Sequence, residues 1–374
     1  MKKDIIFRPA WTEIDLSALE YNLKQVKRSV GKNVKILSVV KADAYGHGMI
    51  KVSKRLNKCG VDYFGVASID EGIALRKQGI KKPILILENS LKRFAKYIVD
   101  YNLTQSISTI ELAVSINNYA KRKGKTASVH IEIDTGMGRL GVWYKEAINF
   151  VKKINRLDCL KIEGLYTHFP CADSDRTFTN YQINCFISLI RKLKKCNIHI
   201  PLCHAANSIG VIEYEDCYLN LVRPGLMLYG IYPKRNLKVN LKPVLSFKTK
   251  IIYLKRTPAG RAISYGRTYI TKKPTTIATL AVGYGDGYLR GLSNKADVLI
   301  NGKRAKIVGR ICMDQTMVDC GNLKGIKIGQ TAVLVGRQGR EQISLEELSH
   351  LAGTISYELV CSIGKNTAAR FYEN

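Results

Sequence analysis

The chain has 374 residues, of which 60 are lysine or arginine and 30 are aspartate or glutamate, giving a formal net charge of +30. Hydrophobic residues make up 46% of it, which is ordinary for a globular protein and excludes a disordered polyelectrolyte. The length favours two domains. The basic residues are spread over positions expected to face solvent, and no nucleic-acid-binding motif accompanies them, so we expect no specific nucleic-acid partner.

The ten cysteines form no Cys-x-x-Cys pair and match no zinc-site spacing, so we expect no metal centre. The apolar stretch near the N-terminus is too short for a signal peptide. No stretch approaches the ~20 apolar residues of a membrane span. We therefore expect reduced thiols, a cytoplasmic location and no membrane association.

The first predicted element is a helix over residues 16–30, with Asp15 as its N-cap and Gly31 at its end. Further helical patterns, such as those at 110–123 and 146–154, alternate with short apolar stretches. These stretches predict eight strands, at residues 36–40, 63–67, 83–87, 104–107, 129–134, 162–167, 202–206 and 221–223. The alternation predicts the α/β class, and eight strands in about 200 residues favour a (β/α)8 TIM-like barrel over a Rossmann sheet. We assign the barrel to residues 12–235.

Beyond residue 235 the pattern changes to that of a mostly β domain. Residues 245–251 alternate with period two, and further strands are predicted at 277–282, 297–300, 305–308 and 332–335, separated by turn residues. We assign this second domain to residues 236–374 and expect an N-terminal strand within residues 1–11 to join it.

Lys41 follows directly on the apolar strand 36–40. The edge where parallel strands end is where barrels and open α/β sheets build their active sites. A partly desolvated lysine there can act as a nucleophilic amine towards an aldehyde. A solvated strand-end lysine is the alternative, and it is the commoner one for a lysine considered alone.

Polar residues follow other predicted strands as well. Taken singly, each has a structural explanation: His168 as a satisfied histidine, Ser208 as the cap of a helix starting near Ile209, and the glycines of 136–141 as a tight turn. Phosphate sites of such barrels lie in the loops after strands seven and eight. Ser208 with the backbone N–H groups of Gly225 and Leu226 would form such a site. A lysine opposite a phosphate cup suits pyridoxal 5'-phosphate (PLP).

Nine motifs then resemble, in order and over essentially the whole chain, the alanine racemases, PLP-dependent enzymes of fold type III. They are VVKADAYGHG (39–48), DTGMGRLG (134–141), YTHF (166–169), ANS (206–208), VRPG (222–225), SYG (264–266), VGY (282–284), GRICMD (309–314) and TISY (354–357).

The resemblance implies a role for each matching residue. Lys41 would bind PLP covalently and act as one base, and Tyr265, from the second subunit of a head-to-tail homodimer, would be the opposing base. Arg223 would face the pyridine nitrogen, with His168 beside it. The cofactor would further be held by Tyr45, Asn207, Ser208, Gly225, Leu226 and Tyr357. The amino-acid substrate would be bound by Arg139, Met313 and Tyr284, with Arg290, Arg310 and Asp173 along the access path. The implied function is interconversion of L- and D-alanine, with D-alanine used for peptidoglycan.

Glu132 is a departure from the family pattern, which usually has a carbamylated lysine at this position. Glu132 shares a strand face with Asp134, and a buried carboxylate requires a partner. We predict that Glu132 pairs directly with Arg139 on the substrate side, without a carbamate. The alternative is that Glu132 contacts water or another base.

Other functions remain as alternatives at this stage. A serine or broader amino-acid racemase is one, because a pocket discriminates weakly against an added hydroxyl. A PLP-barrel decarboxylase would require a cysteine- and aspartate-bearing substrate site that the sequence does not present. A PLP-carrier protein would not require Tyr265 or the second domain.

Overall fold

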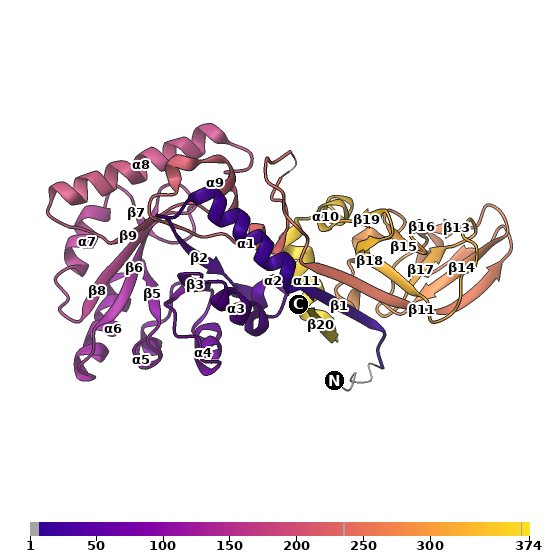
Figure 1. Ribbon diagram of the computed structural model, residues 1–374, viewed down its shortest axis with the longest axis horizontal. Helices are drawn as coiled ribbons and strands as arrows, with labels where there is room; N and C mark the ends of the chain where they lie inside the picture. The colour runs from indigo at the N-terminus through magenta and orange to yellow at the C-terminus, as the bar shows by residue number, and fades with distance from the viewer. Residues whose placement is uncertain (1–6, 235, 368) are drawn as a thin grey trace.

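The computed structural model describes residues 7–234, 236–367 and 369–374. Two large sheets organise the chain, one in each half of the molecule (Figure 1). The N-terminal half is a ring of parallel strands covered by helices, and the C-terminal half is mostly β-structure. Strands β1 and β11 run between the two halves (Figure 1).

The first sheet is a nearly closed parallel barrel of eight strands in the order β10-β2-β3-β4-β5-β6-β8-β9, with the short β7 beside β6. Its strands match the eight predicted ones: β2 (Lys35–Val39), β3 (Tyr63–Val66), β4 (Ile84–Ile86), β5 (Thr104–Ile107), β6 (Ala127–Asp134), β8 (Leu160–Tyr166), β9 (Leu202–His204) and β10 (Leu221–Val222), with β7 at Val142–Trp143. Most strand residues are buried, as expected where helices cover a parallel sheet. The predicted fold class is confirmed.

The barrel helices lie on the outside of the strands. They are α1 (Leu16–Val30), α3 (Met49–Lys58), α4 (Ile69–Lys77), α5 (Ala95–Asp100), α6 (Ile110–Arg122), α7 (Ala147–Ile154), α8 (Arg176–Lys195) and α9 (Ser208–Glu213). The segment labelled α2 (Lys41–Tyr45) is a left-handed turn at the end of β2. As predicted, Asp15 caps α1 by accepting a hydrogen bond from the N–H of Ala18, and Gly31 ends it. No helix in the described parts of the chain is long and apolar enough to cross a membrane.

The second large sheet has nine strands in the order β19-β18-β15-β16-β17-β14-β11-β1-β20. They are β1 (Ala10–Asp15), β11 (Leu245–Thr257), β14 (Thr275–Leu280), β15 (Asp297–Ile300), β16 (Lys303–Ile307), β17 (Thr316–Asp319), β18 (Thr331–Gln338), β19 (Glu341–Ile343) and β20 (Ala369–Glu373). A separate hairpin is formed by β12 (Ala262–Ile263) and β13 (Tyr269–Ile270), and the C-terminal helices are α10 (Leu345–Ala352) and α11 (Ser356–Asn366).

The N-terminal strand pairs with the second sheet, antiparallel to β11 and parallel to β20. It occupies Ala10–Asp15, later than the predicted strand within residues 1–11, of which residues 1–6 lie outside the described residues. The proposed boundaries, 12–235 and 236–374, stay a prediction.

Helix α11 packs against the loop that follows β2 at a contact between two glycine backbones. A Cβ atom on Gly364 would lie 2.2 Å from Cα of Gly46, and one on Gly46 would lie 2.7 Å from the carbonyl oxygen of Val360. Gly46 also has a positive φ of 77°. Only glycine satisfies both conditions, and the contact brings the C-terminal helix directly onto the loop of Lys41.

We expect Gly46→Ala to destabilise the protein more than Gly79→Ala does. Gly79 has a similar φ of 82° but open space around it, so it carries only the left-handed backbone cost of about 1–2 kcal/mol. Gly46→Ala adds an overpacking cost of about 1–3 kcal/mol. Urea denaturation of the two variants measures the difference, and equal losses would contradict the role assigned to this contact.

Candidate active site

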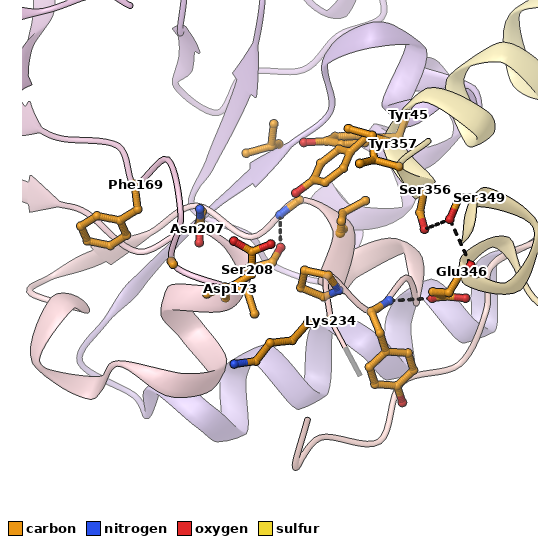
Figure 2. A pocket seen from close by; sticks show the side chains of 18 of the residues that line it. Tyr45, Phe169, Asp173, Asn207, Ser208, Lys234, Glu346, Ser349, Ser356 and Tyr357 are labelled. Atoms are coloured by element: carbon orange, nitrogen blue, oxygen red, sulfur yellow. Dashed lines mark hydrogen bonds between the residues drawn. The ribbon is translucent and has the colours of Figure 1, made fainter. Parts of the chain in front are cut away.

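A large cavity of about 1770 Å³ opens at the C-terminal ends of the barrel strands. Residues of α10 and α11 complete its wall, so both halves of the chain form it (Figure 2). The structure brings together here most of the residues predicted from the sequence: Lys41, Tyr45, Glu132, Arg139, His168, Asp173, Asn207, Ser208, Arg223, Gly225, Leu226 and Tyr357.

Lys41 begins a strained turn. The four residues after it, 42–45, all have φ between 51° and 56°, a left-handed conformation that non-glycine residues rarely adopt. Glu71 holds the start of the turn, because its carboxylate accepts hydrogen bonds from the N–H groups of Ala42 and Ala67, each at 2.7 Å. Asp43 accepts one from the N–H of Met49 at 2.7 Å and forms an ion pair with Arg370 at 2.9 Å. The strain is therefore compensated by contacts outside the turn, as is typical of functional sites.

The turn places Tyr45 in a cluster of aromatic rings at one end of the cavity. Its ring lies 4.9 Å from that of Tyr229 and 5.9 Å from that of Tyr357. Figure 2 shows Tyr45 and Tyr357 side by side. Gly225 passes so close that a Cβ there would lie 2.5 Å from the Tyr45 hydroxyl. The missing side chain leaves room for the hydroxyl beside the backbone.

Ser208 is not the helix cap that its position suggested. Asn207 caps α9 by accepting a hydrogen bond from the N–H of Gly210 at 3.0 Å. Ser208 Oγ instead accepts hydrogen bonds from the N–H groups of Gly225 at 3.0 Å and Met227 at 3.1 Å. The Gly225 N–H, predicted as a phosphate donor, thus has a partner within the chain. With two donors on its oxygen, Ser208 keeps its own O–H for a group in the cavity.

Arg223 is buried and donates to a dense set of acceptors. They are the carbonyl of Thr167 at 2.8 Å, the carbonyl of Ala205 at 3.1 Å, His204 Nδ1 at 2.7 Å and His168 Nδ1 at 3.3 Å. Because guanidinium has no acceptor, Nδ1 of each histidine must be the unprotonated nitrogen. Burial and the adjacent charge of Arg223 lower the pKa of His168 to about 3, so His168 is neutral beside the permanently charged arginine.

A hydrogen-bond chain continues from Arg223 through the barrel interior. His204 Nε2 donates to His130 Nδ1 at 2.8 Å, and His130 Nε2 faces the Glu163 carboxylate at 3.6 Å. Burial lowers the pKa of both histidines. Neutral imidazoles with protonated Nε2 are the only tautomers that satisfy the direction of this chain.

The predicted ion pair between Glu132 and Arg139 is absent. None of the ion pairs in the described ranges joins these two residues. The buried carboxylate of Glu132 accepts a hydrogen bond from the Tyr166 hydroxyl at 3.0 Å. Glu132 and Tyr166 are register partners on adjacent strands, which explains the pairing. Burial raises the pKa of Glu132, and Tyr166, Arg223 and Arg139 oppose that rise.

Three predicted residues lie away from the cavity. Tyr265, Tyr284 and Met313 are absent from its lining and form an exposed patch on the second half of the chain, where Tyr265 is 71% exposed. Their loops are in contact, since Ser264 Oγ donates to the carbonyl of Arg310 at 2.5 Å and the Tyr284 N–H donates to the carbonyl of Cys312 at 3.0 Å. Arg290 and Arg310 also lie outside the cavity lining.

Several residues of the site were missed from the sequence. Tyr166 was read only as part of a motif, and His204, His130 and Tyr229 were given no role. The first three are polar residues inside predicted apolar strands, a signal that could have indicated an inward-facing polar chain.

The side chains present fit PLP. Lys41 supplies a primary amine, Ser208, Tyr45 and Tyr357 supply hydroxyl groups at the end of the cavity where Gly225 leaves room, and Arg223 supplies a buried cation. This donor set suits an aldehyde, a phosphate and a ring nitrogen that accepts a hydrogen bond.

Comparisons with known proteins agree with this arrangement. The family model for the alanine racemase N-terminal domain matches residues 14–233, and that for the C-terminal domain matches residues 244–372. The alanine racemase of Halothermothrix orenii is 46% identical, over 99% of this chain and 98% of the relative. The solved alanine racemase of Clostridium difficile 630 has a TM-score of 0.93 at 37% identity, over 99% of this chain and 97% of that chain. The solved alanine racemase of Bartonella henselae is described with covalently bound pyridoxal phosphate. It has a TM-score of 0.88 at 28% identity, over 98% of this chain and 99% of that chain.

Three buried histidines and the half-buried His168 predict acid sensitivity of the fold. The pKa is lowered to about 4 for His47 and about 3 for His168, and it is also lowered for His130 and His204, mainly by burial. The unfolded chain, with histidine pKa values near about 6.5, therefore binds more protons below that pH. Their stabilising contribution is full above about pH 6.5 and is lost as the pH falls, by up to about 1.4 kcal/mol per pH unit for each histidine.

Urea denaturation at about pH 7, 6 and 5 should thus give a falling free energy of unfolding. His47 Nδ1–H donates to the carbonyls of Ala44 and Tyr45, and an asparagine amide can imitate that donor. The slope of the free energy of unfolding against pH counts the protons taken up on unfolding, and His47→Asn should reduce that count by about one. A flat profile between about pH 7 and 5 would refute the burial of neutral histidines.

Proposed function

The chain belongs to the alanine racemase family and is an amino-acid racemase; on that premise we propose that it converts L-alanine and D-alanine by a two-base reaction in active sites shared between two copies of the chain. The observation that carries the proposal is the separation of the predicted residues. Lys41 lies in the barrel cavity, and Tyr265 lies in the exposed patch, outside the lining of that cavity.

Lys41, Ser208, Tyr45, Tyr357 and Arg223 would hold PLP. When bound, PLP withdraws electron density from the substrate α-carbon. Arg223 keeps its proton at neutral pH, because a guanidinium is not a practical proton donor. It would therefore give the ring nitrogen a hydrogen bond and no proton. The hydrogen bonds that Arg223 donates to two backbone carbonyls and two histidines support a fixed orientation of its guanidinium.

Two bases are required because racemisation removes a proton from one face of the α-carbon and returns one to the other. Lys41 Nζ would hold the proton on one face. The hydroxyl of Tyr265 of the partner subunit would hold it on the opposite face. A contiguous exposed apolar patch marks an interface in a soluble protein, which supports insertion of Tyr265, Tyr284 and Met313 into a second copy. The interface would also exclude water from the reacting atoms.

The substrate carboxylate would be bound by Arg139, which lines the cavity and is exposed to it. Glu132, whose carboxylate accepts a hydrogen bond from Tyr166, would line the same side of the cavity. D-alanine produced here would serve peptidoglycan synthesis.

All ten cysteines lie in described segments as free thiols, which supports the predicted cytoplasmic location.

A mixture of two inactive variants tests the shared site. Lys41→Ala and Tyr265→Phe homodimers should each lose activity, since each lacks one base at both sites. Unfolding and refolding them together should restore up to about a quarter of the wild-type rate, because half of the dimers are mixed and each mixed dimer has one intact site. D-alanine formation from L-alanine is the measurement.

Two results would contradict the proposal. Without recovery in the mixture, both bases would belong to one chain. Persistent exchange of the α-proton of L-alanine by Tyr265→Phe would show that Tyr265 is not the base for that isomer. Refolded wild-type protein is the control for recovery, and a panel of amino acids that includes serine tests the choice of substrate.

A further inference from the structure

The two loops that carry Tyr284 and Met313 are joined by their backbones. Tyr284 lies in the 3-10 helix η5 (Tyr284–Asp286), and the N–H of Gly285 donates to the carbonyl of Met313 at 2.9 Å. A Cβ on Gly283 would lie 2.2 Å from the carbonyl oxygen of Cys312 and 2.3 Å from that of Met313. The loops therefore touch without intervening side chains.

A single guanidinium reaches both loops. Arg8 Nε donates to Asp286 Oδ1 at 2.5 Å, and its Nη2 donates to Asp286 Oδ2 at 2.7 Å and to Asp314 Oδ1 at 2.8 Å. Asp286 ends η5, and Asp314 directly follows Met313. The planar fork of arginine suits such a bidentate contact, whereas lysine offers a single ammonium group.

In the ion pair of Arg8 with Asp286, the carboxylate is buried and the guanidinium is partly exposed. The Asp286 side chain is 2% exposed, and its Oδ2 also accepts a hydrogen bond from the N–H of Gly283 at 2.9 Å. A buried carboxylate requires a cationic partner, and Arg8 is the one recorded for it within the described residues. Asp314, by contrast, is 58% exposed.

The backbone next to Arg8 is itself fixed to the nine-stranded sheet. The carbonyl of Pro9 accepts hydrogen bonds from the N–H of Lys250 at 3.2 Å and from Thr249 Oγ1 at 2.8 Å, both on β11. Arg8 thus projects from an anchored segment towards the two loops, and it is separated from them in sequence by more than two thirds of the chain.

We propose that Arg8 is a positioning residue that holds Tyr284 and Met313 as one rigid unit for the active site of the partner subunit. This inference depends on the proposed shared site. Neither the arginine nor its two carboxylates need contact substrate. Arg8 and its two carboxylates act by fixing the loops that carry Tyr284 and Met313. Loss of these contacts should therefore weaken substrate binding more than it slows the chemical steps.

The test is the steady-state kinetics of the PLP-loaded full-length enzyme. Arg8→Gln should raise KM for L-alanine by about tenfold and change kcat by less than about threefold. Arg8→Lys should give an intermediate KM, because one ammonium can reach one carboxylate but not both. Arg55→Gln is the matched control: Arg55 forms a partly exposed ion pair with Glu20 at 2.8 Å, and its loss should leave KM unchanged.

Asp314→Asn keeps the buried pair of Arg8 with Asp286 and weakens only the contact of Arg8 with the Met313 loop. It should raise KM by about threefold while the thermal midpoint stays within about 2 °C of wild type. This variant decides the matter if Arg8→Gln fails to fold. Wild-type KM in both folded variants overturns the proposal for Arg8. Absence of alanine racemisation by the wild-type enzyme would instead overturn the proposed function.

Discussion

The approach of Gly46 to Gly364 is the contact on which the site depends. It lets α11 pack directly on the loop of Lys41, so Tyr357, at the start of that helix, reaches the barrel cavity. Neither half of the chain forms the cavity wall by itself. A larger residue at either position would separate the two backbones, and the lysine loop would lose the helix that covers it.

The barrel interior is unusual in the number of ionisable groups it buries. Arg223, His204 and His130 form a line whose polarity is fixed by the guanidinium, because arginine can only donate. Burial of a charge is unfavourable unless it is hydrogen-bonded, and Arg223 donates such bonds to two carbonyls and two neutral imidazoles. The positive charge is therefore retained on one residue and is not shared with its neighbours.

Much of the fold could be predicted from the sequence. The eight strands are short, apolar and separated by helices, and each was placed within a few residues. Lys41 could be placed because it follows a predicted strand, and Arg223 because it ends one. The partner of Glu132 could not be predicted, because the choice depends on the register of β6 against β8. That register puts Tyr166 directly beside Glu132. The chain of His204 and His130 depends on contacts between strands in the same way. Under the proposed shared site, the position of Tyr265 relative to a cavity depends on a second copy, which periodicity within one chain does not encode.

The turn after Lys41 has a further consequence for the order in which the protein becomes functional. Its four left-handed residues cost about 1–2 kcal/mol each, so a short peptide of this sequence would not keep the conformation. The groups that offset this cost, Glu71, Arg370 and the backbone of α11, come from distant parts of the chain. A nascent chain lacking its last helix and strand therefore lacks two of the contacts that offset this cost, and the turn of Lys41 becomes stable only late, when synthesis is complete.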